Sequence, residues 1–157
     1  TRFPAQATAA GVDGLLLVDC PPEERGDLGV AMRESGLDGI CLIAPTTTRD
    51  RVKDISSIAS GFIYYVSLKG ITGAGKLNSS ELTEPVSQIR EFSDLPVAVG
   101  FGIKNAEMAV EVAQHADAVV IGSALVEALS ETQTQEQACS VAKSFLAPVR
   151  KSLDNME

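Results

Sequence analysis

The stretch that decides the fold is PVAVGFGIKN, residues 96–105. It begins as a short run of apolar, β-branched residues, which is typical of a buried strand, and it ends in a Gly-x-Gly turn. A helical pattern starts near Asn105, so these residues predict a strand, a tight turn and the N-terminus of a helix. The same order returns at residues 118–124, where AVVI is followed by Gly-Ser-Ala and a second helix.

These two turns predict a phosphate site. Amides at the start of a helix lack intrahelical partners and the helix dipole favours negative charge, so glycine turns beside two helix starts suit a phosphate dianion. In an eight-fold βα barrel, the loops after the last two strands are the usual phosphate site. The alternative is that the glycines only turn strand into helix. A dinucleotide site fits less well, because Asn105 stands where that motif needs its third glycine.

Strands and helices alternate along the rest of the chain. Further apolar strands are expected at residues 14–19, 39–44 and 62–67, with helical patterns between them. This alternation predicts an α/β fold with a parallel βα repeat. The 157 residues show no break in composition, so residues 1–157 are expected to form a single domain.

Five strands cannot close an eight-stranded barrel, which typically takes about 250 residues. Because the phosphate-type glycines fall in the last two units, we predict an incomplete TIM barrel made of its C-terminal five βα units. The strand at residues 14–19 is then an unpaired edge, open to pairing with another chain. The alternative is a complete five-stranded doubly wound domain.

Composition excludes several classes of function. The net charge of −8 argues against nucleic-acid binding, and no apolar run approaches the roughly 20 residues that span a bilayer. Three scattered cysteines, Cys20, Cys41 and Cys139, fit a reduced, cytoplasmic compartment. The single histidine, His115, has no second candidate ligand nearby, so no metal site is expected.

A long loop follows the third expected strand. Residues 68–80 contain GITGAG, with Thr72 at its centre. Loops of this length are uncommon in compact domains and are often lids, and this one leaves the end of a strand where active sites of parallel sheets lie. We expect a lid; the alternative is a surface excursion without function.

Taken together, these segments resemble the tryptophan synthase alpha chain family. YYVSLKGITGA (64–74), GFGI (100–103) and GSA (122–124) match that family in order and spacing, and VDCPPEE (18–24) is similar to its segment after strand four. The resemblance implies a TIM-barrel lyase of tryptophan biosynthesis that cleaves indole-3-glycerol phosphate to indole and glyceraldehyde 3-phosphate. It also implies an α2β2 complex with a pyridoxal-phosphate beta subunit, and no cofactor in this chain.

The resemblance further implies roles for single residues. Tyr64 would lie beside the reacting end of the substrate, and Phe101 would line the pocket. Thr72 would hydrogen-bond the catalytic aspartate when the lid closes. The substrate phosphate would be bound by amides and one hydroxyl of Gly73, Gly102, Gly122 and Ser123.

Two other features follow from the same resemblance. Pro21 and Pro22 resemble part of the surface that faces the beta subunit. The catalytic glutamate and aspartate of the family come from the second strand and the loop after it, and nothing here corresponds to them. Asp19 is the one carboxylate at the end of an expected strand, and its alternative role is to fix the start of the following helix.

The catalytic residues therefore stay unknown, and the chain by itself is expected to be inactive. Two alternatives for function remain open. One is another phosphate-binding barrel enzyme, of the sugar-phosphate epimerase or indoleglycerol-phosphate synthase type. The other is a non-catalytic module that docks on the beta subunit.

Overall fold

The computed structural model describes residues 2–18, 20–67, 79–100 and 102–156. Within these ranges a parallel sheet runs in the order β1-β2-β3-β4-β5, with every neighbouring pair parallel. Its strands are β1 (Gly14–Leu16), β2 (Asp38–Ile43), β3 (Ile63–Val66), β4 (Val97–Gly100) and β5 (Ala118–Val120). The predicted parallel βα repeat is confirmed.

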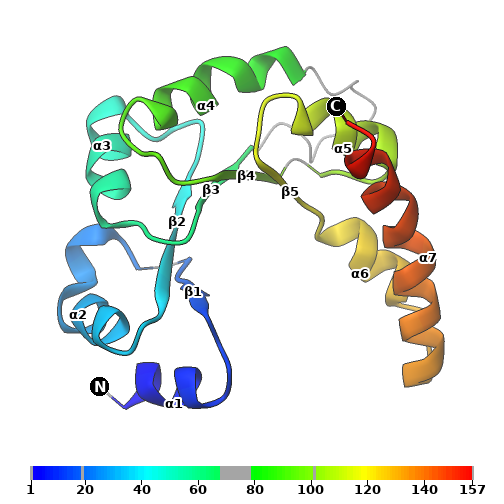
Figure 1. Ribbon diagram of the computed structural model, residues 1–157, viewed down its shortest axis with the longest axis horizontal. Helices are drawn as coiled ribbons and strands as arrows, with labels where there is room; N and C mark the ends of the chain where they lie inside the picture. Colours follow the sequence, from blue (N-terminus) through cyan, green and yellow to red (C-terminus); the bar gives the residue numbers. More distant parts are fainter. Residues whose placement is uncertain (1, 19, 68–78, 101, 157) are drawn as a thin grey trace.

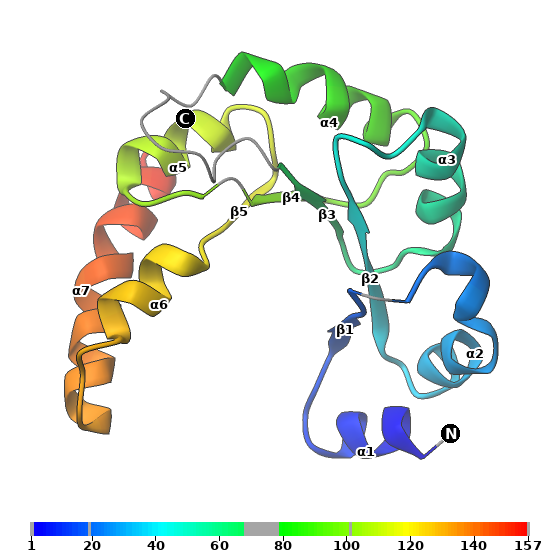
Figure 2. The same ribbon diagram turned by 180° about the vertical axis from the view of Figure 1, so that it is seen from behind.

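Most of the helices lie on the convex side of the sheet, which curls and leaves its concave side open (Figures 1 and 2). A doubly wound domain would carry helices on both faces and would reverse its strand order at one point. Strands in sequential order on a curled sheet form part of a (β/α)8 barrel instead, so the prediction of five TIM-barrel units is confirmed and the doubly wound alternative is wrong. The helical elements are α1 (Phe3–Ala9), η1 (Pro22–Glu24), α2 (Gly26–Glu34), α3 (Arg49–Ile58), η3 (Ser79–Leu82), α4 (Thr83–Arg90), α5 (Ala106–Ala113), α6 (Ser123–Leu129) and α7 (Gln135–Asp154).

The core lies between the sheet and these helices. Alternate strand residues point outward, and Ile63, Val97 and Val99 are completely buried there. They pack against apolar residues of the covering helices, among them Val52, Ile55, Val86, Ile89, Ala109 and Val112. At the other end of the sheet, β1 is shorter than the predicted 14–19 strand and leaves Leu16 42% exposed.

Asp117 joins the starts of the last two strands. Its Oδ2 accepts a 2.8 Å hydrogen bond from the Val97 amide, and its own amide donates to the Val97 carbonyl at 2.9 Å. Arg90 Nη2 contacts both carboxylate oxygens at 3.0–3.1 Å. The Val97 amide, and after it Arg90, hold the pKa of Asp117 below its ordinary value of 3.8.

This carboxylate makes stability depend on pH in the acid range. Because its pKa is lowered by folding, its contribution is complete above pH 3.8 and is lost as the pH falls toward the lowered value. We expect Asp117→Asn to lower the free energy of unfolding by about 1 kcal/mol at pH 7, mostly because the Val97 amide then donates to a neutral acceptor, since the half-exposed Arg90 pair is screened. Urea unfolding at pH 7 and pH 2.5 measures this. The exposed Asp94→Asn is the control, and equal stability of both variants at pH 7 would contradict the prediction.

Candidate functional site

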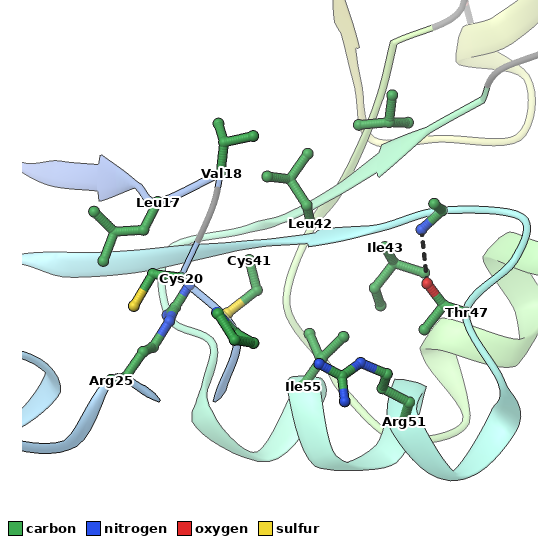
Figure 3. Close-up of a pocket in the computed structure, with 13 residues that line it drawn as sticks. Leu17, Val18, Cys20, Arg25, Cys41, Leu42, Ile43, Thr47, Arg51 and Ile55 are labelled. Atoms are coloured by element: carbon green, nitrogen blue, oxygen red, sulfur yellow. Dashed lines mark hydrogen bonds between the residues drawn. The ribbon is translucent and has the colours of Figure 1, made fainter. Parts of the chain in front are cut away.

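An apolar wall lines the concave face of the sheet. Pairing in register places Leu42 beside Tyr64, and the side chains two positions away in each strand share this face. Figure 3 shows Val18 and Leu42 pointing to the opposite side of β2 from Cys41 and Ile55. The wall consists of Leu16, Val18, Leu42, Tyr64 and Val66, and three of these residues (Val18, Leu42 and Val66) also line a cavity of about 510 Å³.

Sequence reasoning missed this wall. Leu16 and Val18 are 42% and 69% exposed, which is unusual for large apolar side chains next to a core. The strands are apolar on both faces, so the alternation that would separate wall from core is hidden in the sequence. The signal available in the sequence is the spacing of two within a strand, which puts Leu42 on the opposite face from Cys41 and Ile43, and Tyr64 and Val66 on the opposite face from Ile63 and Tyr65.

Toward β4 the wall changes to small residues, and Tyr64 fills the space they leave. A Cβ atom at Gly100 would lie 2.8 Å from Cε2 and 2.9 Å from Cζ of Tyr64, so the ring crosses directly over the end of β4. Burial raises the pKa of the Tyr64 hydroxyl, which therefore stays protonated at neutral pH. The structure thus places Tyr64, a predicted site residue, on the concave face within β3, with its ring reaching the end of β4.

We expect Gly100→Ala to displace the Tyr64 ring. Overpacking of this kind costs about 1–3 kcal/mol in unfolding free energy, and it moves the ring away from the concave face. Removing the ring as well, in Gly100→Ala with Tyr64→Leu, is expected to cost less than the two single changes added together. Chemical unfolding of the four proteins measures the coupling. Gly29→Ala, where the new methyl group meets only an ordinary 3.5 Å contact, is the matched control, and additive losses would contradict the predicted contact.

The turn after β4 has a backbone that suits glycine. Gly102 has a φ of +62°, in the left-handed region. The helix after it begins where predicted, and Asn105 is its N-cap, accepting a 2.9 Å bond from the Met108 amide. The Asn105 side chain satisfies only the Met108 amide, so the Ala106 and Glu107 amides of this first turn have no acceptor inside α5.

The turn after β5 leads directly into α6. The Gly122 carbonyl accepts hydrogen bonds from the Leu125 and Val126 amides at 3.0 and 3.1 Å. The amides of Ser123 and Ala124 come before these bonds and, as in any first helical turn, have no acceptor inside the helix. They can therefore donate to a group placed at the end of β5.

The two turns lie side by side. Gly100 of β4 pairs with Val120 of β5, and Gly102 and Gly122 each follow their paired residue by two positions. The structure therefore brings together the predicted residues Gly102, Gly122 and Ser123 at one end of the sheet. The predicted residues Asp19, Thr72, Gly73 and Phe101 lie outside the described residues.

The remaining predictions concern the partner surface and metals. Pro21 lines the cavity at the end of β1, and its carbonyl accepts a 2.9 Å bond from the Glu24 amide; Pro22 begins η1. The Nδ1 atom of His115 lies 3.1 Å from the Thr83 hydroxyl. Across the described ranges, no group of three or more His, Cys, Asp or Glu side chains could hold a metal ion. In the same ranges no helix has the length and apolar character to cross a membrane.

Comparison with known proteins points to one family. The family model described as tryptophan synthase alpha chain matches residues 1–154. The tryptophan synthase alpha chain of Polynucleobacter necessarius is 47% identical over 154 residues, covering 98% of this chain and 58% of the relative. That of Burkholderia lata is 51% identical over 152 residues, covering 97% and 56%.

Solved structures agree with this match. The crystal structure of the tryptophan synthase alpha chain from Legionella pneumophila superposes with a TM-score of 0.83 at 39% identity, covering 98% of this chain and 56% of that one. A chain from the tryptophan synthase α2β2 complex of Pyrococcus furiosus gives 0.83 at 34% identity, covering 95% and 60%. This chain spans a little over half the length of the relatives it matches, and it belongs to the tryptophan synthase alpha chain family.

Proposed function

We propose that this protein acts in tryptophan biosynthesis as a lyase, in the retro-aldol cleavage of indole-3-glycerol phosphate to indole and glyceraldehyde 3-phosphate. One observation carries the proposal: the apolar wall on the concave face of β1–β3 ends beside the two glycine turns after β4 and β5. The substrate has a matching polarity, with an apolar bicyclic ring at one end and a phosphate dianion at the other. Family membership supports the same reaction.

Each part of the substrate then has a proposed partner. The indole ring would lie against Leu42, Val66 and their neighbours in the apolar wall. The protonated Tyr64 hydroxyl would stand beside the glycerol carbons that react, with Phe101 lining the pocket and Thr72 in the lid. The phosphate would accept hydrogen bonds from Gly73, Gly102, Gly122 and Ser123.

We further propose that the chain contributes the phosphate and indole portions of the site but not its acid and base. At the carboxyl ends of the strands, the described residues facing the concave side are apolar or small, and none of them is a carboxylate. Orientation without proton transfer does not cleave a carbon–carbon bond, because the retro-aldol step needs a base at one end and an acid at the other.

The proposed partner is a tryptophan synthase beta subunit in an α2β2 assembly in the cytoplasm. The Pyrococcus furiosus relative is part of such a complex by its own description. On this chain, the proposed contact surface contains Pro22, which is the first residue of η1, and Pro21, which precedes it. A module that only docks on the beta subunit, without any role in catalysis, is the competing proposal.

A binding titration tests the substrate class. Indole-3-propanol phosphate, which cannot undergo the cleavage, is expected to bind at least ten times more tightly than ribulose 5-phosphate, because only the former covers the apolar wall. Glycerol phosphate serves as the control for the phosphate group alone. A preference for ribulose 5-phosphate would favour an epimerase-type enzyme, and equal affinities for the three compounds would contradict the role of the apolar wall.

A further inference from the structure

A buried arginine anchors the end of the short helix η1 to the sheet. Arg25 directly follows η1, only 8% of it is exposed, and its Nη2 donates to the Ile40 carbonyl of β2 at 3.2 Å. Figure 3 shows its side chain running toward Cys20 and Cys41. Burial raises the pKa of the Cys41 thiol, and the Arg25 guanidinium, which interacts with this thiol, offsets part of that rise. Arg25 is therefore an internal anchor and not a surface charge.

Close packing also fixes the position of Arg25. A Cβ atom at Gly39 of β2 would lie 3.3 Å from Nη1 of Arg25, which is tighter than most Cβ contacts in proteins. On the other side, a Cβ atom at Gly29 of α2 would lie 3.5 Å from Cβ of Arg25. The absence of a side chain at Gly39 thus leaves the room that the guanidinium occupies between β2 and α2.

A second arginine ties the outer side of η1 to α3. Nη1 and Nη2 of Arg51 donate to Oε1 and Oε2 of Glu23 at 2.9 and 3.4 Å. The backbone amide of Glu23, and after it Arg51, lower the pKa of the Glu23 carboxyl. Both side chains are about half exposed or more, so the pair adds little to the stability of the chain. Because both carboxylate oxygens are engaged, the pair instead fixes the orientation of η1.

The turn depends on these two anchors. η1 has three residues, Pro22–Glu24, and the Glu24 amide donates to the Pro21 carbonyl at 2.9 Å. Such a short helix is marginal by itself, because a single turn fixes several backbone angles for each hydrogen bond that it forms. Its conformation is therefore set by the contacts with β2 and α3.

We propose that Arg25 and Arg51 are positioning residues for the partner surface, holding Pro21 and Pro22 in the orientation that a beta subunit binds. This inference rests on the partner and the contact surface given under the proposed function. A turn that is fixed before binding loses less conformational freedom when the partner docks, so both arginines favour affinity without Arg25 being exposed to the partner.

Amide hydrogen exchange tests the positioning without any partner. The Glu24 amide is expected to exchange at least about tenfold faster in Arg25→Met and in Arg51→Glu, because the turn opens more often. Arg25→Lys, which keeps a donor for the strand carbonyl, is expected to exchange at an intermediate rate. Arg33→Met, on the exposed side of α2, is the control for loss of a positive charge and is expected to leave this exchange unchanged.

The unfolding temperature separates positioning from general stability. Arg25→Met is expected to unfold at the same or a higher temperature, because a buried charge whose Nε has no hydrogen-bond partner is replaced by an apolar side chain. Unchanged exchange at Glu24 in both arginine variants would overturn the inference. So would a large fall in the unfolding temperature of Arg25→Met, since faster exchange would then report general destabilisation.

Calorimetry with a bacterial tryptophan synthase beta subunit tests the consequence for binding. Arg25→Met, Arg51→Glu and Glu23→Arg are each expected to weaken binding by about fivefold or more. Combining the last two changes restores the pair with exchanged charges and is expected to recover most of the affinity. A failure of this rescue would mean that Glu23 or Arg51 contacts the partner directly, which contradicts a positioning role.

A variant of the contact surface separates this inference from the proposed function. If Pro21→Gly with Pro22→Gly loses affinity while the arginine variants keep it, the positioning role is wrong and the proposed partner stands. If the unmodified chain does not bind the beta subunit, the proposed partner is wrong and the inference is overturned with it.

Discussion

A polypeptide of these 157 residues is expected to release glyceraldehyde 3-phosphate from indole-3-glycerol phosphate at least about 10⁴ times more slowly than a full-length relative. The reason is chemical. An acid and a base each contribute roughly 10²–10⁴ in rate, and the described concave face offers apolar and glycine residues at the ends of its strands. Tyr64 is proposed to orient the substrate, but burial raises the pKa of its hydroxyl, which makes it too weak an acid to replace a carboxyl group.

The experiment measures glyceraldehyde 3-phosphate with a coupled dehydrogenase, for the purified chain and for its Asp19→Asn variant. Adding a separately expressed N-terminal segment of a relative, chosen to restore eight strands, is expected to recover activity. Fast release by the chain that disappears in Asp19→Asn would identify Asp19 as the catalytic carboxylate and would overturn the proposed division of the site. Co-purification with a beta subunit, with no recovery of activity in the reassembled barrel, would favour the docking module.

The second large effect is expected at the phosphate turn. Gly102→Asp should weaken the binding of glycerol phosphate by about 100-fold or more, because it places a carboxylate where the dianion is proposed to sit. Asp and Asn both tolerate the left-handed backbone that Gly102 adopts at φ +62°, and they have nearly the same size. Gly102→Asn is therefore the matched control, and it isolates the effect of charge from that of the backbone and of volume.

Calorimetry with glycerol phosphate, on the barrel completed by the added segment, measures both variants. Gly102→Asn is expected to lose no more than about tenfold, since its amide is neutral and can still donate a hydrogen bond. Equal affinities for Gly102→Asp and the unmodified chain would remove this turn from the phosphate site. Equal and large losses in both variants would assign the effect to the backbone and not to charge.

Local sequence was enough to predict much of this protein. Residues 96–105 contain an apolar, β-branched run, a glycine turn and an asparagine, and these became β4, the turn at Gly102 and the N-cap of α5. Such features depend on neighbours in the chain, through propensity, turn geometry and capping. The same order of strand, glycine turn and helix returns at residues 118–124. It predicted that the two glycine turns lie close together, because neighbouring parallel strands end at the same edge of the sheet.

Only the tertiary structure decided which face each residue occupies. Because β2 is apolar on both sides, its sequence does not distinguish the environment of Leu42 from that of Ile43. In the structure Ile43 is in the core, whereas Leu42 lies on the concave wall. Similarly, the contact that leaves no room for a Cβ atom at Gly100 is with the ring of Tyr64, a residue of the preceding strand.

Arg25 is the clearest case. Within the sequence EERGD it reads as one more solvated charge at the start of a helix. The break between η1 and α2 instead carries it under β2, where its Nη2 bonds to Ile40. Burial depends on what other segments cover, and no local pattern encodes it. The sequence therefore determined the elements and the positions of the glycine turns, whereas packing between distant strands and helices decided the apolar wall and the buried charge.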